Sequence, residues 1–135
     1  MEKNVKSALD NASRWCSTAQ EAYVAKNYDN SVYAMEMALE IGLKAVLISR
    51  GVEYPKIHDI TGVIRASLNA DINKKRINQD MIDDMLSTLQ VLLKYRNAAG
   101  YMFANNVSMD VLKRVADDNL EKVEKYLTFL NKILV

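Results

Sequence analysis

Apolar side chains recur every three or four residues along most of this chain, which is the spacing of one face of an α-helix. The pattern begins with a helix over residues 4–26. A polar break at residues 27–30 follows, where Asp29 or Asn30 is a candidate N-terminal cap for a second helix. We expect that second helix to run to about Arg50.

The second predicted helix is apolar on nearly all sides, and such a helix is usually central and heavily buried. Its polar residues form one narrow line, Glu36, Glu40 and Lys44, which is most simply a salt-bridged stripe in water and alternatively the lining of a cleft. Gly51 follows the helix as a C-terminal glycine would. Small residues form a second line that lets a neighbouring backbone come close: Ala34, Ala38, Gly42 and Ala45.

The second half of the chain contains three more predicted helices. A loop pinned by Pro55, the only proline, leads to a short helix over residues 59–69. A polar connection then precedes a helix over residues 79–99, and Ser108 caps a last helix that extends to about Leu134. No segment alternates with period two for long enough to be a strand. We therefore predict an all-α, single-domain protein over residues 1–135, an up-and-down bundle of four to five antiparallel helices.

Composition narrows the class of protein further. The 135 residues carry a formal net charge of only +1, which does not indicate a strongly basic nucleic-acid binder. The single cysteine, Cys16, cannot form an internal disulfide, and its place on the apolar face of the first helix predicts a buried, inert thiol. No apolar run is long enough to span a membrane, and the N-terminus does not resemble a signal peptide. We expect a cytoplasmic protein.

The sequence lacks the residues that several common metal and catalytic sites require. One histidine and one cysteine cannot build a usual zinc site. A Ser-His-acid system is not credible with the one histidine at a loop-to-helix junction, and the chain has no glycine-rich phosphate loop. A di-iron bundle needs Glu-x-x-His repeats, which are absent. We predict no metal site and no cofactor.

Two basic features leave alternatives open. His58 can pack beside the start of the third helix, which is the simpler interpretation, or it can face a ligand cleft. The basic run Lys74-Lys75-Arg76 is most simply a solvated surface, and alternatively a contact for RNA phosphates.

Arg96 is the leading candidate for a functional residue. It lies at the end of an apolar helix, where a guanidinium needs an anionic or hydrogen-bonding partner. It can pair with a carboxylate of the protein near the helix C-terminus, or it can bind phosphate with Asn97 and Tyr101 beside it as hydrogen-bond donors or a base-stacking surface. The residue types alone do not separate these two roles.

The order of these motifs resembles the HEPN domain, a family of small helical bundles whose name stands for higher eukaryote and prokaryote nucleotide-binding. The resemblance covers most of the chain. Its motifs are Trp15 with Ala19 and Ala22, residues 27–29, residues 34–47, residues 51–60, and Tyr95-Arg96 followed by small residues and Tyr101.

The resemblance implies a helical bundle that is commonly a homodimer, often a prokaryotic protein encoded beside a minimal nucleotidyltransferase. Other members are toxin ribonucleases with an Arg, four to six residues, and then a His. Arg96 matches the arginine, but the possible histidine positions hold Tyr101, Met102 and Phe103. Tyrosine is a weak general base near neutral pH, and Phe103 has no hydroxyl for a partner enzyme to modify.

We therefore expect a non-catalytic nucleotide- or RNA-binding module, with Arg96, Asn97 and Tyr101 as its nucleotide- or phosphate-binding residues and no catalytic residue. Two alternatives are open. One is a metal-independent endoribonuclease with a degenerate motif, in which Tyr101 or His58 carries the proton. The other is a helical interaction protein, antitoxin-like, with no ligand of its own.

Overall fold

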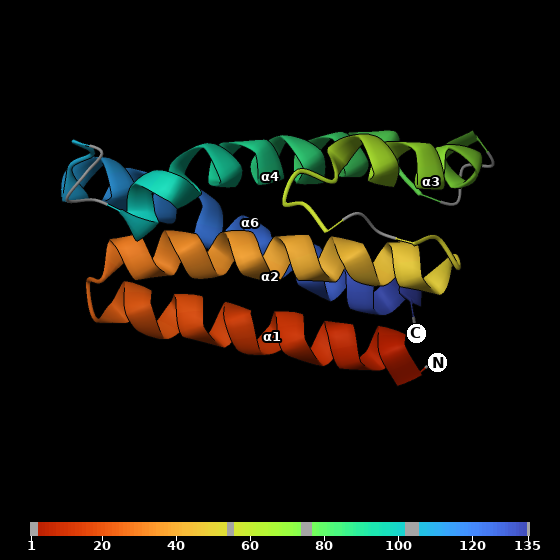
Figure 1. The fold of residues 1–135 in the computed structure, drawn as a ribbon, viewed down its shortest axis with the longest axis horizontal. Helices are drawn as coiled ribbons and strands as arrows, with labels where there is room; N and C mark the ends of the chain where they lie inside the picture. Colours follow the sequence, from red (N-terminus) through yellow and green to blue (C-terminus); the bar gives the residue numbers. More distant parts are fainter. Residues whose placement is uncertain (1–2, 54–55, 74–76, 102–105, 135) are drawn as a thin grey trace.

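The computed structural model describes residues 3–53, 56–73, 77–101 and 106–134. Within these ranges the chain forms helices and no strand, which confirms the predicted all-α class. The helices form an elongated bundle with both termini at the same end (Figure 1). Their bounds are α1 Lys3–Val24, α2 Tyr28–Ser49, α3 Thr61–Asn73, α4 Gln79–Gly100 and α6 Met109–Leu134.

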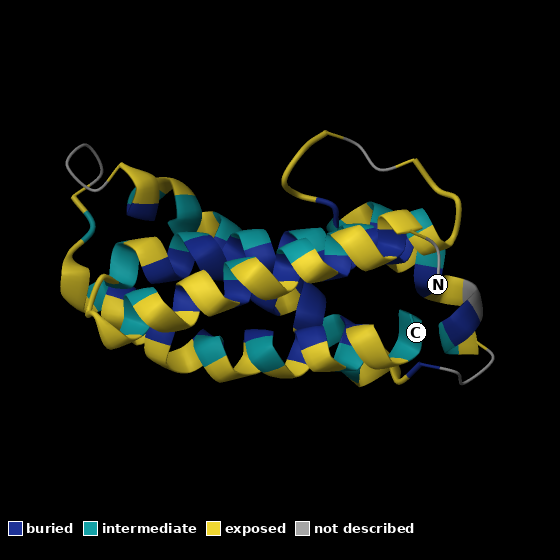
Figure 2. Cartoon of the chain, turned by 90° about the horizontal axis from the view of Figure 1, so that it is seen from below, coloured by how far each residue is buried: buried dark blue, intermediate teal, exposed yellow. Residues whose placement is uncertain are grey.

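Helix α2 occupies the centre of the bundle, as its apolar sequence predicts. It contacts α1, α3, α4 and α6, and its fully buried side chains include Met35, Leu39, Leu43 and Leu47. By contrast, α1 and α6 bury one face and expose the other, which gives the striped burial pattern of Figure 2.

The small-residue line on α2 works as predicted at Gly42, where α6 approaches closely. A Cβ atom built on Gly42 would lie 2.7 Å from Cδ2 of Leu127 and 3.2 Å from Cδ1 of Leu130. Both leucines are on α6, so the missing side chain of Gly42 sets the distance between the two helices.

The predicted helix ends are partly right. Gly51 has φ +67° after the C-terminus of α2, and the Ser108 hydroxyl accepts a hydrogen bond from the amide of Val111 at 3.2 Å. The predicted cap of α2 is wrong, because the helix begins at Tyr28 and Asn27 occupies the cap position without a side-chain hydrogen bond.

Helix α3 continues to Asn73, beyond its predicted end. The added turn contains Asp71, whose carboxylate lies 3.1 Å from Nη2 of Arg50 and is buried against the end of α2. This ion pair joins residues far apart in the chain, which a local sequence pattern does not contain.

Cys16 is buried as predicted, and burial raises the pKa of its thiol. None of the helices described is both long and apolar enough to cross a membrane. The predictions for Pro55, for Lys74-Lys75-Arg76 and for Phe103 concern positions outside the described residues.

Candidate functional site

The last turn of α4 places Arg96 against α2. Its Nε atom lies 3.0 Å from Oε1 of Glu36, and its Nη2 donates a hydrogen bond to the Tyr33 hydroxyl at 3.0 Å. The guanidinium carbon also lies 4.8 Å from the centroid of the Tyr33 ring, a cation–π distance. Arg96 therefore has the carboxylate partner that one interpretation of the sequence predicted.

The partner carboxylate is in an unusual environment. Glu36 is 0% exposed, its Oε1 is close to Nε of Arg96 without a well-directed hydrogen bond, and the carboxyl group of Glu40 lies within hydrogen-bonding reach of it. One turn further along α2, Glu40 is also buried, and its Oε2 accepts a hydrogen bond from the ammonium of Lys44 at 2.8 Å. The polar line of α2 is thus part of the interior, and the interpretation as a solvated stripe is wrong.

Burial has a direct electrostatic consequence at Glu36. Its pKa is raised from an ordinary 4.5 to about 8, chiefly because burial removes water from the carboxylate and secondly because Glu40 places a negative charge beside it. Arg96 and Lys44 act in the opposite direction but do not cancel this effect. The raised pKa favours the neutral form of Glu36, which weakens the compensation of the Arg96 charge near neutral pH.

His58 joins the same group of residues from the segment before α3. Its Nδ1 lies 2.9 Å from Oε1 of Glu40, and its side chain is 54% exposed. The histidine also lines a cavity beside Arg96. The structure supports the cleft-facing interpretation of His58. The helix entry of the simpler interpretation is also present, since Asp59 accepts a hydrogen bond from the amide of Thr61 at the start of α3.

A cavity of about 360 Å³ lies beside this polar group. Its lining is Tyr33, His58, Arg96, Asn97, Gly100 and Tyr101. All three residues predicted to bind nucleotide or phosphate, Arg96, Asn97 and Tyr101, therefore lie at one cavity. Arg96 contacts a carboxylate of the protein, as one interpretation predicted, and it also lines the cavity that the phosphate-binding interpretation requires.

The sequence analysis missed Tyr33 as a site residue and treated Glu36 and Glu40 mainly as surface. A signal for them existed in the chain. Polar residues on a helix that is otherwise apolar all round have to face either water or another polar group, and Tyr33, Glu36 and Glu40 recur at steps of three and four on one face of α2.

The donor atoms of Glu36, Glu40 and His58 lie within 4.8 Å of one another, close enough to suggest a metal site. The charges nearby are unfavourable to a cation. Lys44 already contacts Glu40, Arg96 contacts Glu36, and a divalent ion would add two positive charges beside them. The group is better explained as a polar network that holds Arg96 and His58 at the cavity.

Comparison with known families identifies the class of protein. The model of the HEPN domain matches residues 5–133, nearly the whole chain, so the protein belongs to the HEPN domain family. No curated protein and no solved structure shows significant similarity to the chain.

Proposed function

We propose that this HEPN domain is a non-catalytic module that binds a phosphate group of a nucleotide or of single-stranded RNA in the cavity beside Arg96. The observation that carries the proposal is the placement of Arg96. The side chain is 11% exposed and held by Glu36 and Tyr33, yet it lines a cavity with Asn97 and Tyr101. A guanidinium fixed in this way loses little freedom when it binds an anion.

The electrostatics of the network support an anionic ligand. The raised pKa of Glu36 weakens the negative charge opposite Arg96, whose guanidinium lines the cavity and gives its wall a positive group. A phosphate diester carries the complementary charge, and Tyr101, which is 60% exposed, offers a ring on which a base can stack.

The test is titration with a short single-stranded RNA, followed by calorimetry, on the wild type and on Arg96→Gln. We expect binding to the wild type and at least a tenfold loss in the variant, since charge-assisted hydrogen bonds are worth about 1.5–3 kcal/mol. Arg65→Gln is the matched control, because Arg65 is a half-exposed arginine of α3 that pairs with Asp83. Equal affinity of Arg96→Gln and the wild type, with helical content preserved, contradicts the proposal.

One observation favours a second candidate, the metal-independent endoribonuclease. The Glu40 carboxylate accepts a hydrogen bond from Nδ1 of His58, which leaves Nε2 as the nitrogen available for proton exchange at a cavity that Arg96 also lines. In this candidate His58 takes the place of the histidine missing from the sequence motif. Cleavage of single-stranded RNA in excess chelator that is lost in His58→Gln supports this candidate, and no cleavage above the Arg96→Gln background dismisses it.

The family resemblance also leads us to propose a homodimer and a minimal nucleotidyltransferase as partner. The apolar sides of α2 do not supply the dimer surface, since α1, α4 and α6 of the same chain cover them. Light scattering at micromolar concentration tests the dimer, and a monomeric mass contradicts it. Co-purification with a nucleotidyltransferase encoded beside the gene tests the partner.

A further inference from the structure

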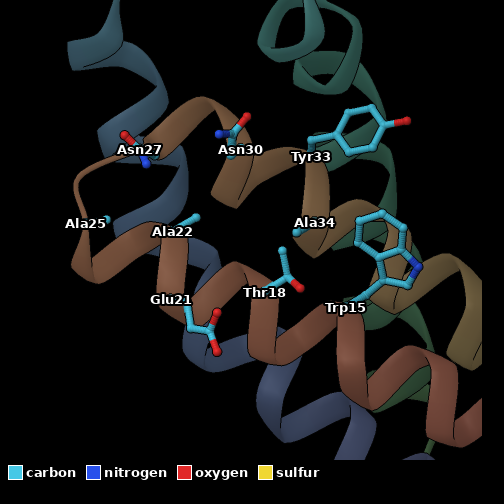
Figure 3. A pocket seen from close by; sticks show the side chains of 9 residues that line it. All are labelled: Trp15, Thr18, Glu21, Ala22, Ala25, Asn27, Asn30, Tyr33 and Ala34. Atoms are coloured by element: carbon cyan, nitrogen blue, oxygen red, sulfur yellow. The ribbon is translucent and has the colours of Figure 1, made fainter.

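A second cavity lies next to the Arg96 cavity and shares one wall with it. Its volume is about 530 Å³, and it opens between α1 and the first turns of α2. Tyr33 lines both cavities, with its ring in contact with Arg96 on one side and near the Trp15 ring on the other. Figure 3 shows the Trp15 and Tyr33 rings at one end of this second cavity, and Asn27 at the other.

The lining of the second cavity suits a neutral, flat, polar-edged group better than a phosphate. None of the described residues that line it is basic, and Glu21 is among them, so it repels anions. Ala22, Ala25 and Ala34 leave room between the helices, while Asn27 and Asn30 offer amide donors and acceptors. An aromatic ring, an apolar floor and amide groups are the elements with which proteins bind an unstacked base of single-stranded RNA.

From this arrangement we infer that the Trp15 cavity is a base-binding subsite, and that the ligand of the domain is an oligonucleotide whose phosphate lies on Arg96 while a nearby base stacks on Trp15. This inference rests on the proposed phosphate site and adds the class of ligand. The ligand expected is therefore a single-stranded RNA segment that occupies both cavities, because a mononucleotide would fill the Arg96 cavity alone.

The distances agree with a short RNA segment. The Trp15 and Tyr33 ring centroids are 6.4 Å apart, and the Arg96 guanidinium carbon lies 4.8 Å from the Tyr33 centroid, so Trp15 and Arg96 are separated by at most about 11 Å. Each nucleotide of a stacked strand advances by about 3.4 Å, so a trinucleotide spans about 10 Å, close to this upper limit. Tyr33 lies between the two subsites.

The chain provides its own reporter for this subsite, because Trp15 is its only tryptophan. We would titrate the protein with an RNA trinucleotide and, in parallel, with an abasic analogue that carries the same phosphates. We expect the trinucleotide to change the fluorescence of Trp15 and to bind more tightly than the abasic analogue, which should leave the fluorescence unchanged.

Two variants test the same subsite by affinity. Trp15→Ala should weaken binding of the trinucleotide about five- to 150-fold, the equivalent of about 1–3 kcal/mol for a stacked base, with much less effect on the abasic analogue. Because Trp15 packs partly against the core, Ala25→Leu serves as a second variant. Ala25 is an exposed residue of the cavity wall, and the larger side chain should obstruct the cavity while the core stays intact.

The outcomes separate this inference from the proposed function. In one outcome the trinucleotide binds in an Arg96-dependent way, leaves Trp15 fluorescence unchanged, and binds Ala25→Leu as tightly as the wild type. The base subsite is then wrong and the phosphate site stands. If the trinucleotide changes Trp15 fluorescence equally in the wild type and in Arg96→Gln, the phosphate site is wrong, and the linked ligand with it. Loss of binding in Arg96→Gln together with loss of the fluorescence change supports both.

Discussion

Replacing Glu36 with glutamine is expected to change how the stability of this protein depends on pH. The carboxyl group has an ordinary pKa of 4.5 in the unfolded chain and a pKa of about 8 in the folded protein, raised first by burial and then by Glu40. Between these two values the unfolded chain has released the proton while the folded protein retains it. The free energy of unfolding therefore falls as pH rises through this window.

The magnitude follows from the two pKa values. Each pKa unit corresponds to 1.36 kcal/mol, so the shift from 4.5 to about 8 amounts to at most roughly 5 kcal/mol. Most of this difference accumulates between pH 5 and pH 8, over which we expect the wild type to lose about 3 kcal/mol relative to Glu36→Gln. The lowered pKa values of Asp59 and Asp117 act below their ordinary 3.8 and do not enter this window.

The assay is urea unfolding of the wild type and Glu36→Gln at intervals between pH 5 and pH 8, followed by circular dichroism. The quantity of interest is the difference between the two unfolding free energies at each pH, because other titrating groups largely cancel in it. Glu121→Gln, the same substitution at an exposed position of α6, is the control for loss of a surface carboxylate. A difference that stays constant within 1 kcal/mol, or that grows in favour of the wild type with pH, refutes the reasoning.

Three further predictions concern the contacts of Arg96 and the packing around Gly42. Tyr33→Phe removes the hydroxyl that accepts from Arg96, and calorimetry should show RNA affinity lowered about fivefold with little change in melting temperature. The affinity for a phosphate diester should fall as pH rises from 6 to 9, because a bound anion favours the protonated form of Glu36; a flat profile would argue against contact between ligand and network. Gly42→Leu should lower the unfolding free energy by about 1–3 kcal/mol or more, measured in urea, because Leu127 already fills that space.

The helices were predictable because their signal is local. The three- and four-residue spacing of apolar side chains follows from the pitch of the helix itself, and it located every described helix to within a few residues. The errors lie at helix ends, and at the end of α3 the helix contacts a residue from a distant part of the chain. Asp71 belongs to α3 in the folded protein and pairs there with Arg50 of α2, which no window of sequence around residue 71 contains.

The candidate site was predictable only in part. Arg96, Asn97 and Tyr101 are adjacent in sequence, and an arginine at the end of an apolar helix stands out by itself. Tyr33 and Glu36 are about 60 positions away, and their contacts with Arg96 exist only because α2 and α4 pack together. His58 reaches Glu40 because the chain after α2 doubles back along that helix.

What the sequence alone determined is the class of fold, the central place of α2, and the presence of one arginine that needs an anionic partner. Each of these depends on the character of residues within one helix, which periodicity and composition record. The tertiary structure decided what the polar residues do. Glu36 and Glu40 would be ordinary surface carboxylates on an isolated helix. Packing buries them, raises the pKa of Glu36, and places Arg96 against Glu36 at the edge of a cavity.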